Sequence, residues 1–256
     1  MLTTDSFRLD GKVALVTGSG RNIGRAIAEA FAAAGAKVVV NGHRDRAAVD
    51  AVVEGIRARG GEAKAIMADV SQHGEVETLV RSAAEAFGAL DILVSNVGIR
   101  RYQSFFEISV EDWDNVIRTN LSASFYLARN AIPHMQAKRW GRFIVISGYD
   151  GFWSQVTHRA HNITAKQGLH GFAKALAREF GAEGITANTV APGSIDTERD
   201  WSQYPHQAKE KMESQIPRGS FGDVDEVAGA CLFLASNAGG FVSGQVLHVN
   251  GGHYMY

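Results

Sequence analysis

The chain lacks several features that define whole classes of protein. Its 256 residues contain one cysteine, Cys231, which excludes an intrachain disulfide and a metal cluster built on cysteine. No apolar run reaches the length of about 18 residues that predicts a membrane-spanning helix. The formal net charge is -1, so no basic face predicts nucleic-acid binding. The first residues show no basic region followed by an apolar run, and we expect a cytoplasmic protein without a signal peptide.

What the chain does contain is a regular alternation of β-branched runs and helix-length amphipathic segments. Several runs are apolar at successive positions, which is typical of parallel strands covered by helices on both faces. The alternation predicts a single-domain Rossmann fold over residues 1–256, with a doubly wound seven-stranded parallel sheet. The predicted strands are Lys12–Gly18, Lys37–Gly42, Ala63–Val70, Leu90–Asn96, Gly141–Ser147, Gly184–Gly193 and Gly244–Gly252.

The first predicted strand runs through a glycine-bearing turn into a helix, in the sequence VTGSGRNIGRAIAEA. Gly18 permits a tight turn, and Gly24 lets the helix pack close to the sheet. Such a turn directs backbone N–H groups and a helix N-terminus at a pyrophosphate. Its place after a strand and before a helix predicts a dinucleotide site rather than an ordinary turn. The residues assigned to this site are Gly18, Ser19, Arg21, Asn22, Ile23 and Gly24.

The end of the second predicted strand indicates which dinucleotide binds. A carboxylate there would hold the 2′-hydroxyl of NAD, whereas an arginine accommodates the 2′-phosphate of NADP. The sequence offers Asn41, His43 and Arg44, with no acid before Asp45, and Arg21 reaches the same place from the first turn. The pattern therefore favours NADP(H) over NAD(H). The alternative is that both arginines are merely solvated.

A series of ordered motifs spans the chain: TGSGRNIG, ADV, SNVG, RTNLSASFYLAR, TAKQG, VAPGSIDT and GQVLHVNGG. Together they resemble the short-chain dehydrogenase/reductase family over essentially the whole length. Within that family the chain is most similar in character to 3-oxoacyl-carrier-protein reductases and to sugar or polyol dehydrogenases. The resemblance implies that Asn120 is the catalytic asparagine and that Lys166 is the catalytic lysine, which also holds the cofactor ribose. It further implies a substrate loop at about residues 194–220 and cofactor contacts from Asp69, Val70, Asn96, Val97, Gly98, Pro192, Gly193, Ile195 and Thr197.

Two positions depart from the catalytic pattern of that family. In the family a tyrosine gives or takes the carbonyl proton, the lysine lowers the pKa of that tyrosine, and a serine holds the substrate oxygen. Tyrosine and lysine share a helix face four residues apart, but the residue four before Lys166 is Asn162. An amide does not titrate in a useful range, so it cannot replace a phenol as proton source. The place of the serine holds Gly148, or Ser147 if the alignment shifts by one residue.

Other side chains are candidates for the missing proton donor. His161 lies beside Asn162 but about 100° round the helix, and His158 lies shortly before it. An imidazole, with its ordinary pKa of about 6.5, is a competent acid–base group. The alternative is that both histidines belong to an exposed loop. Tyr102, Tyr149 and Asp150 are further candidates, although packing or substrate stacking is the favoured role of the two tyrosines at the rim of the cleft. Trp153 and Trp201 are expected to line a substrate cavity, for a ring or a sugar.

Two functions follow from these residues. The first is an NADP(H)-dependent oxidoreductase that moves a hydride between nicotinamide and a small carbonyl or alcohol substrate, with an atypical proton donor. The second is a cofactor-binding protein of the same fold that is not a dehydrogenase: a lyase, an isomerase or a regulatory protein. No metal site is predicted.

The resemblance also implies an assembly, a homotetramer or homodimer. It would form through two long predicted helices, Glu111–Lys138 and about Asn162–Gly181, and through the last strand. The apolar side chains on these helices that fit an interface, and fit a core equally well, are Phe125, Leu127, Phe172, Leu176 and Phe180.

Overall fold

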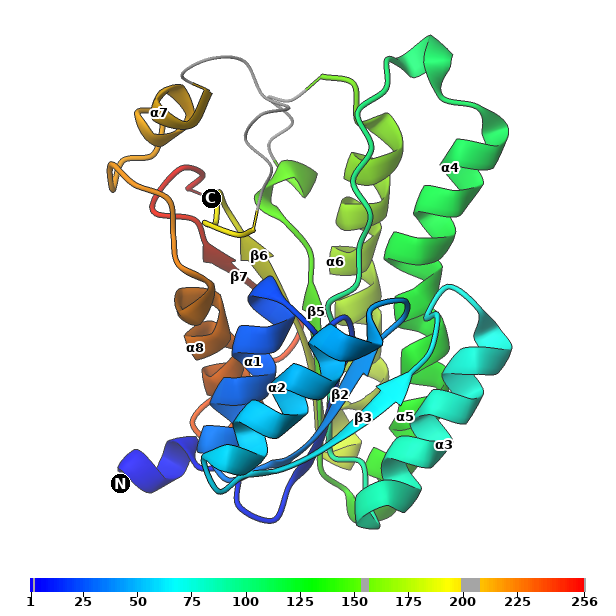
Figure 1. Ribbon diagram of the computed structural model, residues 1–256, viewed down its shortest axis with the longest axis vertical. Helices are drawn as coiled ribbons and strands as arrows, with labels where there is room; N and C mark the ends of the chain where they lie inside the picture. The colour runs from blue at the N-terminus through cyan, green and yellow to red at the C-terminus, as the bar shows by residue number, and fades with distance from the viewer. Residues whose placement is uncertain (2, 153–156, 199–207, 256) are drawn as a thin grey trace.

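A computed structural model describes residues 1, 3–152, 157–198 and 208–255 (Figure 1). Trp153 and Trp201 lie outside the described residues. The described part forms a seven-stranded sheet in the order β3-β2-β1-β4-β5-β6-β7, and neighbouring strands are parallel throughout. The predicted doubly wound sheet is therefore confirmed. Its strands are β1 (Val13–Val16), β2 (Lys37–Gly42), β3 (Glu62–Met67), β4 (Ile92–Ser95), β5 (Gly141–Ile146), β6 (Ile185–Pro192) and β7 (Val246–Val249).

Helices cover both faces of the sheet (Figure 1). On one face lie α1 (Asn22–Ala33), α2 (Arg46–Ala58) and α8 (Val224–Ala235). On the other lie α3 (His73–Phe87), α4 (Val110–Ile117), α5 (Ala123–Lys138) and α6 (Ala160–Phe180). The shorter helical segments are 3-10 turns at Thr4–Phe7, Phe105–Glu107, Tyr149–Gly151 and Gly181–Glu183, and α7 (Ala208–Glu213).

Strand β1 shows why successive apolar residues predict a doubly covered sheet. All four of its residues are buried. Ala14 and Val16 join the hydrophobic cluster under α1, α2 and α8, whereas Leu15 joins the cluster under α3, α5 and α6. Because side chains alternate between the faces of a strand, a strand buried on both sides needs an apolar residue at every position.

The long helical stretch predicted at Glu111–Lys138 is confirmed, and it runs from Val110 to Lys138 with one change of helix type. Between α4 and α5 the chain forms a π-helical turn, Arg118–Ser122, in which Thr119 and Asn120 are buried. A π turn widens the helix locally and often accompanies a functional site. The second predicted long helix, about Asn162–Gly181, is confirmed as α6 with its start two residues earlier.

The apolar side chains of these helices divide between core and surface. Leu127 and Leu176 are buried in the core, whereas Phe125 on α5 is 47% exposed and its ring lies 6.4 Å from that of Phe172. Among the described helices, none has both the length and the apolar character that crossing a bilayer requires.

The strand order also predicts where a ligand crevice lies. Strand β1 lies between β2 and β4, so the connections that follow β1 and β4 leave the sheet in opposite directions. Ligands of open parallel sheets bind at such a switch point, beyond the carboxyl ends of the strands.

Candidate active site

A cavity of about 780 Å³ lies at this switch point. Of the cofactor residues predicted from sequence, its wall includes Gly18, Arg21, Asn41, His43, Arg44, Asp69, Val70 and Val97. The wall also includes residues that sequence reasoning missed: Gly20, Gly42, Asp45, Ala48, Val49, Ala68, Ser71, Ile99, Arg100, Arg101, Asn115 and Thr119. Ile99, Arg100 and Arg101 directly follow the SNVG motif, and that position was the available signal.

The glycine turn has the shape that a pyrophosphate needs. Gly18 has a φ of +60°, in the left-handed region that favours glycine. A Cβ on Gly24 would lie 2.3 Å from the Gly18 carbonyl oxygen, so the start of α1 packs against the turn as only glycine allows. The turn that follows β1 and leads into the N-terminus of α1 therefore fits a dinucleotide.

Asn96 and Ser19 hold this turn in place. The Asn96 Nδ2 donates to the Thr17 and Gly18 carbonyls at 3.0 and 3.2 Å. The Ser19 hydroxyl is fully buried and donates to the Val16 carbonyl at 2.6 Å. The Ser19 side chain therefore points into the protein, and it stabilises the glycine turn from its buried side.

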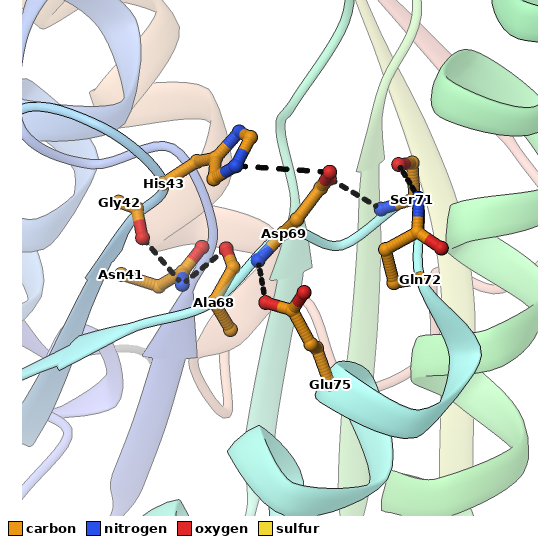
Figure 2. Close-up of polar contacts among 8 residues, drawn as sticks. All are labelled: Asn41, Gly42, His43, Ala68, Asp69, Ser71, Gln72 and Glu75. Atoms are coloured by element: carbon orange, nitrogen blue, oxygen red, sulfur yellow. Dashed lines mark hydrogen bonds and ion pairs between the residues drawn. The ribbon is translucent and has the colours of Figure 1, made fainter.

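Asn41 is committed to the fold in the same way. Its side chain is 1% exposed, and its Nδ2 donates to the Ile66 carbonyl at 3.1 Å and to the Ala68 carbonyl at 3.3 Å. Its Oδ1 accepts from the Gly18 N–H at 3.3 Å. Figure 2 shows this amide turned toward Gly42 and Ala68. Asn41 thus joins the glycine turn to β2 and β3, and its amide is not available to a 2′-phosphate.

His43 and Asp69 face each other at the end of the cavity near β2 and β3 (Figure 2). The His43 Nε2 lies 3.7 Å from the Asp69 Oδ2. The Ser71 N–H donates to the Asp69 Oδ1 at 2.9 Å. Partial burial alone would raise the pKa of Asp69, but the hydrogen bonds from Ser71 and the charges of His43 and Arg44 outweigh it and lower that pKa.

Lys166 lies near the SNVG motif, residues 95–98. A Cβ on Gly98 would be 3.3 Å from the Lys166 Nζ, and this Nζ donates to the Ile146 carbonyl at 2.9 Å. Burial, with a smaller contribution from the charge of Arg100, lowers the pKa of Lys166 to about 8, against the opposing charge of Asp150. The ammonium group is therefore a stronger acid than a free lysine.

Asn120 and Asn162 converge on the backbone of Ile99. The Asn120 Oδ1 accepts from the Ile99 N–H at 2.7 Å, and its Nδ2 donates to the Ile99 carbonyl at 2.9 Å. The Asn162 Nδ2 donates to the same carbonyl at 2.9 Å. Both side chains are at least 97% buried. The two amides fix the loop that leaves β4, which forms part of the cavity wall.

Ser147 and Gly148 face different surroundings. The Ser147 Oγ lies 2.9 Å from the Nε2 of His170 and 3.3 Å from the Val190 carbonyl, and it is buried. Gly148 has extended backbone, and a Cβ placed there would meet nothing within 4 Å. A side chain could therefore occupy the space beside Gly148, while the Ser147 hydroxyl is turned toward His170 on α6.

The two candidate histidines have different surroundings. His161 is fully buried, so it is not part of an exposed loop, and its Nε2 lies 3.3 Å from the Oε1 of Gln103. Burial lowers the pKa of His161. His158 is exposed, and its ring stacks on that of Tyr102 at 5.0 Å. We therefore assign the role of proton donor to neither histidine.

Tyr149 and Asp150 lie on the turn after β5. Burial and the neighbouring Asp150 charge raise the pKa of Tyr149, which makes it a weaker acid than a free phenol. Asp150 is buried and pairs with the guanidinium of Arg159 at 3.4 Å. Tyr149 is therefore less well suited than Lys166 to give up a proton near neutral pH.

The predicted substrate side begins where β6 ends. The Gly193 N–H donates to the Val249 carbonyl at 2.9 Å, and Ile195 pairs with Gly222 in an isolated parallel bridge. Pro192 and Ile195 are buried, and Thr197 is partly exposed. The segment also contacts the start of α1, directly after the glycine turn, because the Glu198 N–H donates to the Oδ1 of Asn22 at 2.9 Å.

Asn22 and Ile23 occupy the first turn of α1. Asn22 has a φ of +49°, a conformation that asparagine tolerates better than most residues other than glycine. Within the described ranges, no group of three or more His, Cys, Asp or Glu side chains could hold a metal ion.

Comparison with known proteins adds independent evidence. Residues 18–254 match the family model described as enoyl-(acyl carrier protein) reductase. The chain is 40% identical over 246 residues to the 3-oxoacyl-(acyl-carrier-protein) reductase FabG of Escherichia coli strain K12, covering 96% of this chain and 98% of that protein. It is 37% identical to the FabG of Aquifex aeolicus, covering 96% and 99%.

Solved structures agree with these relatives. A dehydrogenase/reductase from Sinorhizobium meliloti 1021 superposes with a TM-score of 0.92 at 36% identity, covering 98% of each chain. A gluconate 5-dehydrogenase from Burkholderia cenocepacia J2315, solved with NADP and tartrate, superposes with a TM-score of 0.91 at 34% identity, covering 97% of each chain.

Proposed function

The chain belongs to the short-chain dehydrogenase/reductase family of oxidoreductases, and from that premise we propose that it reduces an anionic carbonyl compound with NADPH, with Lys166 as the proton source. The observation that carries the proposal is the place of Lys166. Its ammonium group lies beside Gly98, which stands between the wall residues Val97 and Ile99, and burial lowers its pKa to about 8. Lys166 itself is not among the wall residues of the cavity.

NADPH, when bound, supplies the hydride to the carbonyl carbon. The glycine turn and the N-terminus of α1 hold the pyrophosphate, and Arg21 with Arg44 favours the 2′-phosphate over a hydroxyl. The Lys166 ammonium gives a proton to the carbonyl oxygen as the hydride arrives, and the resulting neutral amine takes a proton back from solvent. The hydrogen bond from Nζ to the Ile146 carbonyl orients this group.

Asn120 and Asn162 act by position rather than by proton transfer. Both donate to the Ile99 carbonyl and so hold the loop from β4 against α6 and the π turn. We propose that this brace keeps the reaction geometry in a site that has no tyrosine at position 162. Correct placement of a hydride donor against a carbonyl supplies several kcal/mol of the barrier reduction by itself.

Arg100 indicates the charge of the substrate. It is exposed in the cavity wall, and its positive charge acts on both Lys166 and Tyr149. An anionic group near this end of the cavity is therefore stabilised. Two kinds of carbonyl compound fit that requirement and match the relatives: a 3-oxoacyl group on a phosphate-bearing carrier, and a keto derivative of a sugar acid.

The test is NADPH consumption with a matched substrate panel. The panel holds 3-oxoacyl thioesters of acyl carrier protein, keto sugar acids, and uncharged ketones of similar size, and Lys166→Met serves as the control. The proposal expects turnover of an anionic member and its loss in the Lys166→Met variant. If the protein binds NADPH but no panel member consumes it, the cofactor-binding alternative without dehydrogenase activity holds instead.

The exposed ring of Phe125 on α5 supports a further proposal, that the chain forms a homo-oligomer through α5 and α6. A large apolar side chain on the surface is stabilised when a second subunit covers it. Size-exclusion chromatography with light scattering on wild type and Phe125→Asp tests this. A wild-type monomer would contradict it.

A further inference from the structure

Residues 99–103, the first part of the connection from β4 to α4, are bonded at both ends to the residues around the start of α6. The Asn162 Nδ2 donates to the Ile99 carbonyl at 2.9 Å, and the Gln103 N–H donates to the His158 carbonyl at 2.9 Å. Between these two bonds lies Arg100, which is exposed in the cavity wall. The position of the Arg100 charge therefore depends on what holds Ile99 and Gln103.

His161 has a fixed hydrogen-bonding direction, which the start of α6 dictates. The helix begins at Ala160, so the N–H of Asn162 has no carbonyl partner within the helix, and it donates instead to the Nδ1 of His161 at 3.0 Å. The His161 side chain is fully buried, which favours the neutral imidazole. A neutral imidazole that accepts at Nδ1 carries its hydrogen on Nε2. The Nε2–H therefore donates to the Oε1 of Gln103, 3.3 Å away.

The other end of the Gln103 amide is bonded to α4. Its Nε2 donates to the Oδ2 of Asp112 at 2.9 Å. The Asp112 N–H donates to the hydroxyl of Ser109, the residue that caps α4, and the Asp112 Oδ1 accepts from Arg101. Helices α4 and α6 lie side by side (Figure 1). One glutamine side chain thus joins both helices to the segment that carries Arg100.

We propose that Gln103 is a positioning residue for Arg100, and that it thereby sets the preference of the site for an anionic substrate. This inference rests on the proposed function, in which Arg100 is the positive charge that the substrate meets. Gln103 is not among the wall residues of the cavity, so it acts through Arg100. The asparagine brace fixes the segment at Ile99, and Gln103 fixes its other end.

The chemistry of this bond chain dictates how it can be broken and restored. In Gln103→Leu the buried Nε2–H of His161 loses its acceptor, which is unfavourable enough for the segment to shift. In Gln103→Glu the new carboxylate still accepts from His161, but it lies against the carboxylate of Asp112, and like charges repel. Adding Asp112→Asn exchanges the acid and the amide, so the bond between the two side chains forms with its donor and acceptor reversed.

The experiment compares five proteins: wild type, Gln103→Leu, Gln103→Glu, the double variant Gln103→Glu with Asp112→Asn, and the matched control Gln136→Leu. Gln136 also donates its amide to a carboxylate, that of Glu183 at 2.7 Å, and it lies outside the cavity wall. Amide hydrogen exchange of peptides that cover residues 99–103 reports the hold on the segment and needs no turnover. NADPH dissociation constants, and KM and kcat for an anionic panel member and for an uncharged ketone of similar size, report its effect on selectivity.

For Gln103→Leu and Gln103→Glu, we expect faster exchange of the segment and a rise of about tenfold in KM for the anionic substrate, as one charge-assisted contact is lost. The KM for the uncharged ketone, the kcat values and the affinity for NADPH stay close to those of wild type. The double variant and Gln136→Leu behave as wild type in both measurements. A glutamine that only stabilised the fold would leave the anionic selectivity unchanged.

Three results would overturn the inference and leave the proposed function intact. They are wild-type exchange of residues 99–103 in Gln103→Leu, wild-type anionic selectivity in that variant, and a double variant no better than Gln103→Glu. If Gln103→Leu does not fold, the comparison of Gln103→Glu with the double variant decides alone. A wild type that turns over no panel member would overturn the proposed function, and with it the part given to Arg100.

Discussion

Asn120 and Asn162 donate to one acceptor, the carbonyl oxygen of Ile99, and each Nδ2···O distance is 2.9 Å. Asn120 comes from the π turn between α4 and α5, and Asn162 comes from the first turn of α6. A carbonyl oxygen has two lone pairs, and the two amides occupy both. The asparagine at position 162 is therefore a brace for the cavity wall, and the proton must come from another group.

Removing the first amide should weaken the fold measurably. Asn120→Ala loses both hydrogen bonds to Ile99 and leaves a partly buried N–H without its partner, so we expect the free energy of unfolding to fall by about 2 kcal/mol. Urea denaturation measures the change. Asn130→Ala is the control, because Asn130 makes one such bond, to the Tyr126 carbonyl, and should cost about half as much. Equal losses in the two variants would contradict the brace.

Restoring the missing hydroxyls should raise the rate of carbonyl reduction. A Cβ on Gly148 meets nothing within 4 Å, so Gly148→Ser is accommodated. Combined with Asn162→Tyr, it supplies a phenol four residues before Lys166, and a positioned general acid contributes about 10²- to 10⁴-fold. Steady-state kinetics of the double variant measure the gain. Gly148→Ala with Asn162→Phe is the control without hydroxyls, and a gain of equal size there would exclude proton transfer as its cause.

The glycine turn predicts a specific loss of cofactor binding. In Gly24→Ala the new Cβ would lie 2.3 Å from the Gly18 carbonyl oxygen, so the turn must move away from α1. We expect NADPH affinity to fall at least tenfold, as measured by fluorescence titration. Gly229→Ala on α8, where a Cβ meets nothing within 4 Å, should bind NADPH as wild type does. Unchanged affinity in Gly24→Ala would place the pyrophosphate elsewhere.

His170 should make stability depend on pH. Burial lowers its pKa to about 4, so the folded state disfavours the proton that the unfolded chain accepts near pH 6.5. This contribution is present above about pH 6.5 and is lost as pH falls toward 4, and it amounts to about 3 kcal/mol. Thermal unfolding of wild type and His170→Gln at pH 7 and pH 4.5 measures it. We expect a smaller drop in the variant, and equal drops would assign the acid sensitivity to other groups.

The sequence predicted most of the fold because its signals are local. Successive apolar residues in β1 required two covered faces, and Gly18 and Gly24 marked the turn. The π turn at Asn120 escaped prediction because the helical pattern continues through it, and the hydrogen bonds of Asn120 to Ile99, 21 residues away, leave no trace in the local pattern. The orientations of Asn41 and Ser147 escaped for the same reason, since their partners lie on other strands and on α6.

The central claim is that Lys166 supplies the proton, and the pH dependence of a single turnover tests it most directly. NADPH-loaded protein is mixed with the best substrate of the panel, and the first-order rate of nicotinamide oxidation is followed from pH 6 to about pH 10. The pKa of Lys166 is lowered to about 8, and the ammonium form is the acid. The account predicts a constant rate below about pH 8 and a tenfold fall per pH unit above it. A rate that is independent of pH across this range would contradict the account.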